Sequence, residues 1–463
     1  MPGSTTESRK LAKRKFLPLI IRMRTTSDIE TEGRLATFVG QVGGILGHQQ
    51  RRESFAMYAM GLMGDGDRKS VEPIAARACG SAAHGSATHQ RLLHFIANSD
   101  WDDNAVRLHG AKHALAALMA RGEQVECWVF DDTGFLKQGK ESPGVQRQYT
   151  GSAGKVTNCQ TAVSLSLTTG SEHVCADFAL YLPESWANDK GRRKQAHIPD
   201  DVVFRTKPEI AIDMIKQAVK DGLPPGVVLA DSGYGDSSAF RNEVRSQGLE
   251  YAVGVHGPTR VFQVNGNGRI FGKPIGVAAL GKSLSPTAFR TLVWRQGTQA
   301  PLSSRFATLV VVSAHDDGIA IDDRERILLL IEWPEGEDAP SKFTFAALDR
   351  KVSRKELVRI VKERYRTERL YQDLKGELGL DHFEGRTYRG WNHHVSVVLS
   401  CFSFILAERA QRFSPQRVGK SGDRSIGKQA GAALRGLVRH NPSLLRPSGR
   451  ALVASVPAMP SSQ

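Results

Sequence analysis

Residues 125–134 read VECWVFDDTG, an apolar run that passes directly into two aspartates, a threonine and a glycine. Such a short run with polar residues after it is typical of a buried strand that ends in a turn. Residues 227–235, VVLADSGYG, repeat this arrangement. In open α/β sheets, functional groups gather at the carboxyl ends of strands. The two stretches therefore predict an α/β sheet with acidic side chains at one edge.

The segments around these strands predict the rest of the sheet. Strand-like runs cover 161–167, 173–182 and 251–255, and helical patterns cover 209–221 and 237–247. The stretches 137–155 and 184–199 are polar and basic, which indicates loops. The resulting order, β-β-β-α-β-α-β, predicts a mixed sheet covered by helices.

The outer segments have different patterns. Helical periodicity dominates 28–122, and Gly/Pro-punctuated strand patterns at 290–294, 307–313 and 327–332 indicate a β-rich insertion. One long helix is expected from Ser353 to about Leu378 and a more apolar one over 391–409. The predicted organisation is a basic arm (1–27), a helical, DNA-binding domain (28–122), a core in two parts (123–257 and 349–411), the insertion (258–348) and a basic flexible tail (412–463).

Charge and composition limit the classes of protein to which the chain can belong. Residues 1–24 hold seven Lys/Arg against one Glu, and residues 412–463 hold nine against one Asp, so the ends carry nearly all of the net charge of +15. Basic ends suit a polyanion such as DNA, although they also aid solubility. No apolar run approaches the roughly 18 residues of a membrane span. Five scattered cysteines without a C-x-x-C motif indicate neither disulfides nor thiolate zinc, so a cytosolic protein is expected.

Three acidic residues have contexts that predict a metal site. Asp132 and Asp231 each follow a short strand, and Glu368 lies on the long basic helix. Three carboxylates brought together concentrate negative charge, which is costly unless cations neutralise it. Carboxylate oxygens suit Mg²⁺ or Mn²⁺. At about 100° per residue, Arg364 and Lys375 lie within about 40° of Glu368 on one helix face, where they could grip phosphates. A solvated charged helix face is the competing interpretation.

The sequence resembles the DDE transposases of bacterial insertion sequences, in particular the insertion-sequence-701 group of the insertion-sequence-4 lineage. The likeness rests on VFDDT at 129–133, LADSGY at 229–234 and YRTERLYQDLKGELGLDHFEGR at 365–386, and spans about residues 68–409. It implies an RNase H-like catalytic core, two bound divalent ions (Mg²⁺, with Mn²⁺ as a substitute), cleavage at transposon ends and strand transfer into target DNA. It also implies a homodimer on DNA in a cytoplasmic, nucleoid-associated setting.

The resemblance assigns roles to single residues. Asp132, Asp231 and Glu368 become the catalytic metal ligands, and Arg364 and Lys375 match the Arg and Lys of the lineage's Tyr-Arg-Glu-Lys signature. The Tyr of that signature falls on Val361, a departure that puts any role of the tyrosine in doubt. Asp131 competes as the first ligand, on the opposite face of its strand. Asp132 is favoured because the family's Asp-Thr pair falls on Asp132-Thr133.

Further DNA contacts are predicted outside this signature. Trp294 in the insertion could stack on an unpaired base, although a packed tryptophan is the commoner case. Basic residues of the loop after the first aspartates could contact the DNA backbone or be merely solvated, namely Lys137, Lys140, Arg147 and Lys155. Two alternatives to a transposase stay open, a metal-dependent DNA nuclease without strand transfer and a non-catalytic DNA-binding protein derived from a transposase.

Overall fold

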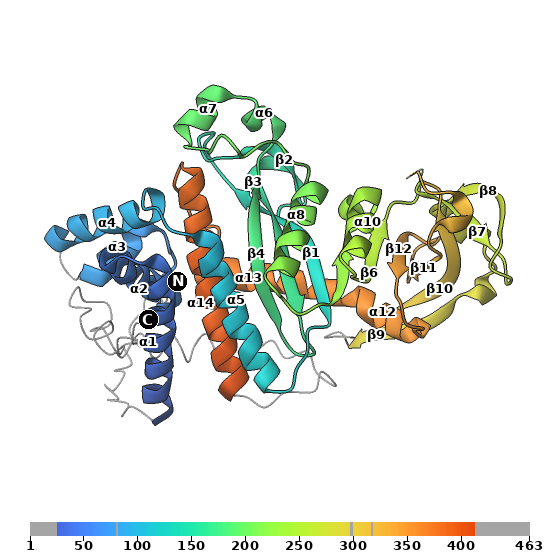
Figure 1. Cartoon of the computed structure of the whole chain (residues 1–463), viewed down its shortest axis with the longest axis horizontal. Helices are drawn as coiled ribbons and strands as arrows, with labels where there is room; N and C mark the ends of the chain where they lie inside the picture. Colours follow the sequence, from blue (N-terminus) through green and yellow to red (C-terminus); the bar gives the residue numbers. More distant parts are fainter. Residues whose placement is uncertain (1–25, 80–81, 297–299, 316–317, 413–463) are drawn as a thin grey trace, which may run out of the picture.

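The computed structural model describes residues 26–412 apart from 80–81, 297–299 and 316–317. The predicted basic arm and tail therefore lie almost entirely outside the described residues. Figure 1 shows a helical part at one end, a sheet covered by helices in the middle and a β-rich part at the other end. The helical part comprises α1 (Thr26–Leu46), α2 (Gln49–Met63), α3 (Val71–Cys79), α4 (Ala82–Ala97) and α5 (Asp103–Ala120). The long α14 (Tyr388–Arg412) packs with these helices.

The central sheet has the predicted order of elements. Its strands are β1 (Cys127–Leu136), β3 (Lys155–Thr168), β4 (His173–Tyr181), β5 (Val227–Ala230) and β6 (Tyr251–Val255), with α8 (Lys207–Lys220) and α10 (Ser238–Ser246) between the later ones. β3 pairs antiparallel with β1 and β4, while β1, β5 and β6 are parallel neighbours. This mixed sheet, covered by helices, confirms the predicted α/β class.

The β-rich insertion continues this sheet. β12 (Lys342–Ala347) pairs antiparallel with β6, and the order then runs through β11 (Ile327–Pro334) and β10 (Pro301–Ser313) to β7 (Arg260–Val264) and β8 (Ile270–Gly276). β9 (Arg290–Gln296) pairs with β10 as a branch, and α11 (Val277–Ser283) also belongs to the insertion. The insertion is therefore anchored to the core by backbone hydrogen bonds rather than by a flexible linker.

Two segments expected to be loops contain regular structure. The first holds β2 (Gln146–Thr150), which pairs with the start of β3, and the second holds the short helices α6 (Glu184–Ala187) and α7 (Lys190–Gln195). The expectation was wrong here because β2, QRQYT, has no apolar alternation. The antiparallel partner β3 supplies the order that the local sequence does not indicate.

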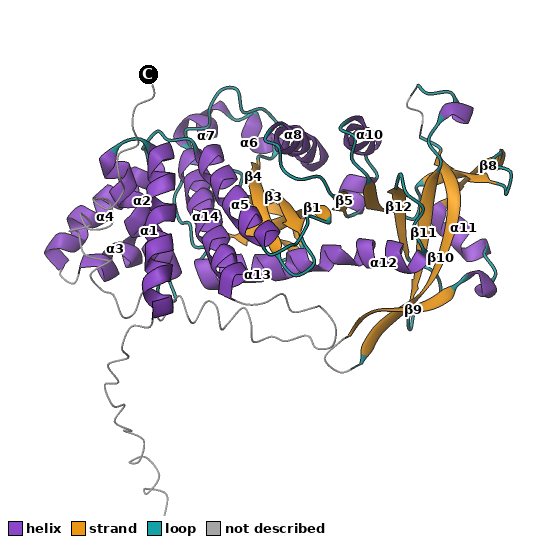
Figure 2. Cartoon of the chain, turned by 60° about the horizontal axis from the view of Figure 1, so that its bottom comes forward, coloured by secondary structure: helices purple, strands orange, loops and turns teal. Residues whose placement is uncertain are grey.

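The helix expected from Ser353 to Leu378 is interrupted. Ser353 caps α12 (Arg354–Lys362), a 3-10 turn covers Glu363–Tyr365, and α13 (Arg366–Leu378) follows. Figure 2 shows α12 and α13 lying end to end along the sheet, from the β-rich part to the helical part. The turn is held from two sides, because Arg364 pairs with Asp131 of β1 and the guanidinium of Arg295 lies 4.2 Å from the centre of the Tyr365 ring.

One hydrophobic cluster runs through the helical part and the sheet, so the two share a core. Trp391 of α14 packs edge-on against Phe135 of β1, and the Tyr58 hydroxyl on α2 contacts His394 Nδ1 on α14 at 2.9 Å. Among the described helices, none combines the length and apolar character needed to cross a bilayer. The thiols of four cysteines are free and buried, namely Cys127, Cys159, Cys175 and Cys401.

A buried ion-pair network fastens α5 to the sheet and to α14. The guanidinium of Arg107, whose side chain is 6% exposed, binds Asp103 on its own helix, Asp177 of β4 at 2.9 Å and Ser396 Oγ of α14 at 2.7 Å. The guanidinium also donates to Asn104 of α5, so a single side chain joins α5, β4 and α14.

Replacing Arg107 by Met is expected to lower the free energy of unfolding by about 3–5 kcal/mol, because two partly buried carboxylates lose their cation. Urea denaturation followed by circular dichroism would measure it. Arg359→Met is the matched control, since Arg359 pairs with Glu126 and Glu356 on the surface, where about 1 kcal/mol or less is expected. Equal effects of the two substitutions would contradict the role of burial.

Candidate metal and DNA site

An acidic cluster lies where β1 and β5 part. β1 pairs with β5 up to Val129 and Leu229, and β5 ends at Ala230, so the next residues of β1 stand beside the turn that follows β5. Asp131, Asp132 and Asp231 each offer a carboxylate oxygen there, and the three oxygens lie within 4.8 Å of one another. Three hard oxygen donors at this separation fit a magnesium or manganese ion.

The start of the short helix α9 (Ser232–Gly235) orients Asp231. Its carboxylate accepts a hydrogen bond of 2.9 Å from the Gly233 amide, as the N-cap of this short helix. The backbone thereby orients the carboxylate of Asp231. The capping role explains why a polar turn follows the apolar strand at this position.

The two aspartates of β1 point to opposite faces of the sheet, as the strand alternation predicts. Asp131 faces the turn between α12 and α13, where Arg364 Nη1 contacts its Oδ2 at 3.1 Å. Asp132 faces α8, where Lys207 Nζ contacts its Oδ2 at 2.5 Å. Lys207 is fixed by the capping box of Thr206 at the start of α8. Sequence reasoning missed Lys207, whose only local signal is this helix start.

The signature residues of the α12–α13 region lie along the face of β1 that carries Asp131. Arg364 contacts Asp131, and Lys375 Nζ donates to Thr133 Oγ1 at 2.8 Å and to the Gly134 carbonyl at 2.7 Å. Glu368 lies between these two cations in the chain and is exposed. Among the described residues, it is not part of the group of mutually close carboxylates.

Burial changes the protonation of this site. It raises the pKa of Asp131 to about 6, an effect that the Arg364 guanidinium opposes and the carboxylates of Asp231 and Asp132 reinforce. Burial lowers the pKa of Lys375, and it lowers that of Lys137 to about 8. Asp131 thus holds its proton more tightly than a free carboxylate does, chiefly because burial disfavours its charged form.

The tip of the β2–β3 hairpin closes one side of the site. Ser152 Oγ lies 3.2 Å from Thr133 Oγ1 and 3.3 Å from Lys375 Nζ. Thr150 packs directly on Gly134, where an added Cβ would lie 2.1 Å from its Oγ1. Glycine follows the Asp-Asp-Thr run because the hairpin tip occupies the space of a side chain. Sequence reasoning missed this contact, which joins residues far apart in the chain.

Gly134→Ala is expected to displace the hairpin tip and to cost about 1–3 kcal/mol of stability through overpacking. Thermal unfolding would measure the loss, and faster amide exchange at residues 151–154 would locate it. Gly139→Ala is the control in the same segment, since a Cβ there meets no atom within 4 Å. Unchanged exchange at the tip in Gly134→Ala would contradict the packing argument.

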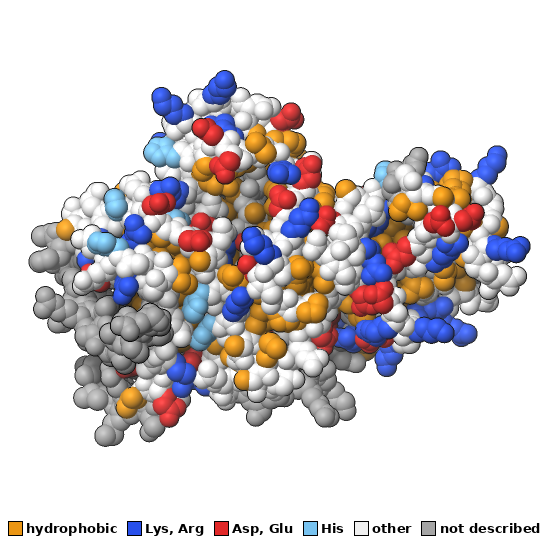
Figure 3. Space-filling view, in the orientation of Figure 1, with side chains coloured by type: hydrophobic (Ala, Val, Ile, Leu, Met, Phe, Trp, Pro, Cys, Tyr) orange, Lys and Arg blue, Asp and Glu red, His pale blue; other side chains and the backbone are white. Residues whose placement is uncertain are grey.

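The other predicted DNA contacts differ in accessibility. Lys140, Arg147 and Lys155 are exposed, whereas Lys137 is half-buried and donates to the Phe383 carbonyl at 2.5 Å. Trp294 packs partly buried under Lys362, whose Nζ lies 4.4 Å from the ring centre. On the face shown in Figure 3, Lys and Arg side chains protrude from the end with α6 and α7 and from the β-rich end.

Comparison with known proteins gives two family matches and a curated relative. The description "DDE superfamily endonuclease" matches residues 41–301, and "Transposase DDE domain" matches residues 205–402. A probable transposase for insertion sequence element IS701 from Microchaete diplosiphon is 31% identical over 206 residues. That match covers 44% of this chain and 48% of the relative, so the chain spans about half the length of the relative it matches.

Proposed function

Because the chain belongs to the DDE superfamily endonucleases, whose matched segment covers more than half of its residues, we propose that it is a DNA transposase that cuts transposon ends and joins them to target DNA. The observation that carries the proposal is the acidic cluster of Asp131, Asp132 and Asp231 at the carboxyl end of β5. Enzymes of this superfamily use divalent metals, and transposases act on DNA. Two Mg²⁺ ions, a homodimer and a nucleoid-associated location are part of the proposal.

The metal ligands proposed from the chain are one aspartate of β1, Asp231 and Glu368. When bound, the ions would activate the attacking hydroxyl and stabilise the leaving oxygen of the phosphodiester. The position of α13 supports Asp131 as the aspartate of β1, since α13 carries Glu368 and its Lys375 contacts Thr133 on the face of β1 that also carries Asp131. Asp132, already paired with Lys207, would then tune the charge of the site.

The cations around the cluster would hold the DNA. Arg364 and Lys375 contact acceptors of β1, and both side chains could turn to phosphate oxygens next to the cleaved bond. Lys would bind as a point charge and Arg as a fork. Exposed Arg147 and Lys155 on the β2–β3 hairpin could contact the backbone farther along the duplex.

A joining assay tests this function against its alternatives. The DNA that flanks the coding region, including any inverted repeats, serves as substrate with Mg²⁺, either intact or pre-cut to expose 3′-hydroxyl ends. A transposase is expected to cut the intact ends and to join the pre-cut ends to a target plasmid. Cutting without joining would indicate a nuclease, and binding without cutting would indicate a non-catalytic DNA-binding protein.

Metal affinity is expected to fall below pH 6, because a proton on Asp131 competes with the ion. A carboxyl with a pKa of about 6 is nearly all ionised at pH 7.5 and about one quarter ionised at pH 5.5, so the dissociation constant for Mn²⁺ should rise about fourfold. Titration followed by electron paramagnetic resonance measures this. In Asp131→Asn the fourfold step should be absent, and equal Mn²⁺ affinities of the unchanged protein at both pH values would contradict the assignment.

The raised pKa of Asp131 also determines how the stability of the fold depends on pH. The folded pKa of Asp131 lies above that of the unfolded chain, so this group contributes stability below about pH 4. That contribution is lost as the pH rises through about 6. A bound cation removes the loss because it neutralises the ionised cluster. Mg²⁺ is therefore expected to stabilise the protein more at pH 7.5 than at pH 5.5.

A further inference from the structure

A second group of polar side chains lies beside the acidic cluster and has no part in the function proposed above. Asp236, directly after α9, accepts from the His256 ring at Nδ1, from the His256 backbone amide at 3.0 Å and from Thr259 Oγ1 at 2.8 Å. On the other side of the ring, His256 Nε2 lies 3.1 Å from Ser232 Oγ. Ser232 is the residue after Asp231.

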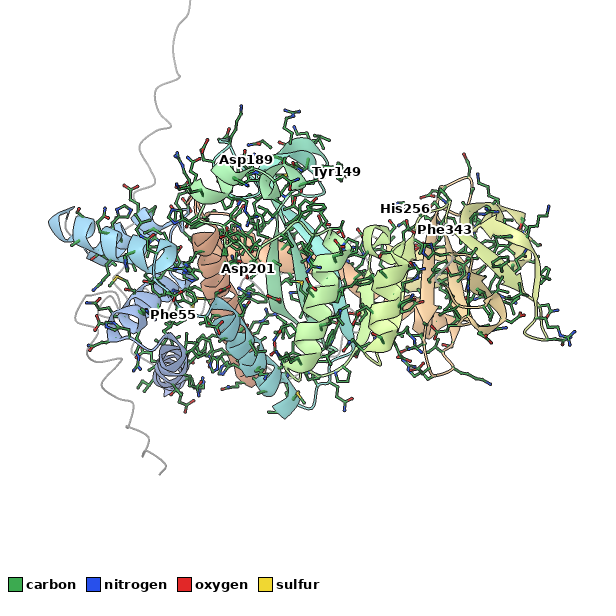
Figure 4. All side chains as sticks on the ribbon, turned by 45° about the horizontal axis from the view of Figure 1, so that its top comes forward. Phe55, Tyr149, Asp189, Asp201, His256 and Phe343 are labelled. Carbon is green, nitrogen blue, oxygen red and sulfur yellow. The ribbon has the colours of Figure 1, made fainter. Side chains whose placement is uncertain are left out.

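The sheet brings this group to the site. β5 and β6 are parallel neighbours, with Ala230 opposite Val253, so Asp231 and His256 follow adjacent strand ends. Gly254 permits the close approach, since a Cβ there would lie 3.0 Å from the Ser232 nitrogen. Figure 4 shows His256 at the border between the core helices and the β-rich part, near Phe343. Adjacent carboxyl ends of parallel strands are where ligands meet such sheets.

The hydrogen bonds define which ring nitrogen carries the hydrogen. A carboxylate only accepts, so Nδ1 of His256 donates to Asp236, and Nε2 of the neutral ring is left as an acceptor. Ser232 then donates its hydroxyl hydrogen to Nε2. This serine–histidine–aspartate arrangement is one that moves protons in enzymes, and it is recognised by geometry rather than by sequence position.

The imidazole ring of His256 contributes little to holding the loop after β6 in place. Its side chain is 62% exposed, and the loop after β6 is already tied to Asp236 by the backbone amide of His256 and the hydroxyl of Thr259. Those two contacts persist if the ring is removed. A largely exposed, oriented ring beside a site for phosphodiester chemistry is placed to take part in that chemistry.

We propose that Ser232 and His256 form the proton-accepting pair of the DNA-cutting and joining site, with Asp236 as a positioning residue; this rests on the function proposed above. The attacking water or 3′-hydroxyl gives its proton to Ser232 Oγ, whose own proton passes to His256 Nε2. The attacking oxygen bonds to phosphorus, and the bond from phosphorus to the 3′-oxygen breaks. The departing oxygen takes a proton from solvent, and the imidazolium returns one to solvent.

The test compares His256→Ala, Ser232→Ala and Asp236→Asn in the full-length protein with DNA and Mg²⁺. His256→Ala is expected to cut about 10²-fold more slowly, the usual contribution of acid–base catalysis, with DNA affinity unchanged. Imidazole added to the solution should restore about tenfold of the rate, because the exposed position leaves room for it. His315→Ala, an exposed histidine of the insertion, is the matched control and should cut normally.

The Ser232→Ala and Asp236→Asn variants test the other two members of the group. Ser232→Ala should lose a similar factor, whereas Asp236→Asn should lose less and gain nothing from imidazole, because its ring is still present. A His256→Ala protein that cuts within threefold of the unchanged protein, or that loses cutting only in proportion to DNA binding, would overturn the inference. If His256→Ala gives either of these results while Asp231→Asn is inactive, the proposed function stands and only this inference fails. An unchanged protein that cuts no DNA would overturn both.

Discussion

Asp231→Asn is expected to lower DNA cleavage by about 10³-fold or more, equal to about 4 kcal/mol of transition-state stabilisation. Asp231 is the member of the acidic cluster that follows β5, so its substitution removes one of the three carboxylates of the proposed metal site. An amide oxygen carries no charge to offset a divalent cation. The fold should persist, because asparagine caps a helix as well as aspartate does and can still accept from the Gly233 amide.

The measurement is single-turnover cleavage of DNA with Mg²⁺, together with DNA affinity and Mn²⁺ binding. Cleavage and Mn²⁺ binding should fall together while DNA affinity is retained. Asp201→Asn is the matched control, since Asp201 is exposed and lies well apart from His256 in Figure 4. Full cleavage by Asp231→Asn would remove the metal mechanism and favour a DNA-binding protein without catalysis.

Asp131→Asn is expected to lose cleavage by about 10²-fold more than Asp132→Asn does, a difference of about 2.7 kcal/mol. Asp131 lies on the face of β1 that the turn before α13 and α13 itself contact, and its raised pKa reports a carboxylate whose charged form is disfavoured by burial. Asp132 faces α8 and already has Lys207 as its partner. A metal ion would relieve the first carboxylate more than the second.

Parallel assays of the two variants discriminate between the aspartates. Lys207→Met is a useful companion, because it removes the partner of Asp132 without touching Asp131. If Asp132 only tunes charge, Lys207→Met and Asp132→Asn should both have effects below about tenfold. A larger loss in Asp132→Asn than in Asp131→Asn would restore the ligand that the Asp-Thr pairing favours in the sequence.

Much of the fold was predictable from local pattern. Short apolar runs that end in polar turns predicted β1 and β5, and the order of strands and helices predicted a mixed sheet, which the structure confirms. The family resemblance is likewise confirmed by the matches to DDE endonuclease and transposase domains. These features are readable because burial of a strand and the start of a turn each depend on a few neighbouring residues.

Other elements were not readable from the chain alone. β2 has no apolar alternation and is ordered by its pairing with β3. The 3-10 turn between α12 and α13 depends on Asp131 and Arg295, which lie far from it in the sequence. The insertion read as a separate β-rich segment, but β12 pairs with β6 and makes it part of one sheet. Each of these features is decided by a partner distant in sequence.

The sequence by itself determined the class of the sheet and which carboxylates stand at its edge, because both follow from residues next to one another in the chain. Only the tertiary structure decided which way each carboxylate faces and what meets it there. Arg364 contacts Asp131, Lys207 contacts Asp132, and His256 contacts Ser232 next to Asp231, each from a different element. The electrostatic surroundings of Asp131, Asp132 and Asp231 depend on distances across these elements, because electrostatic interactions follow distance in space rather than position along the chain.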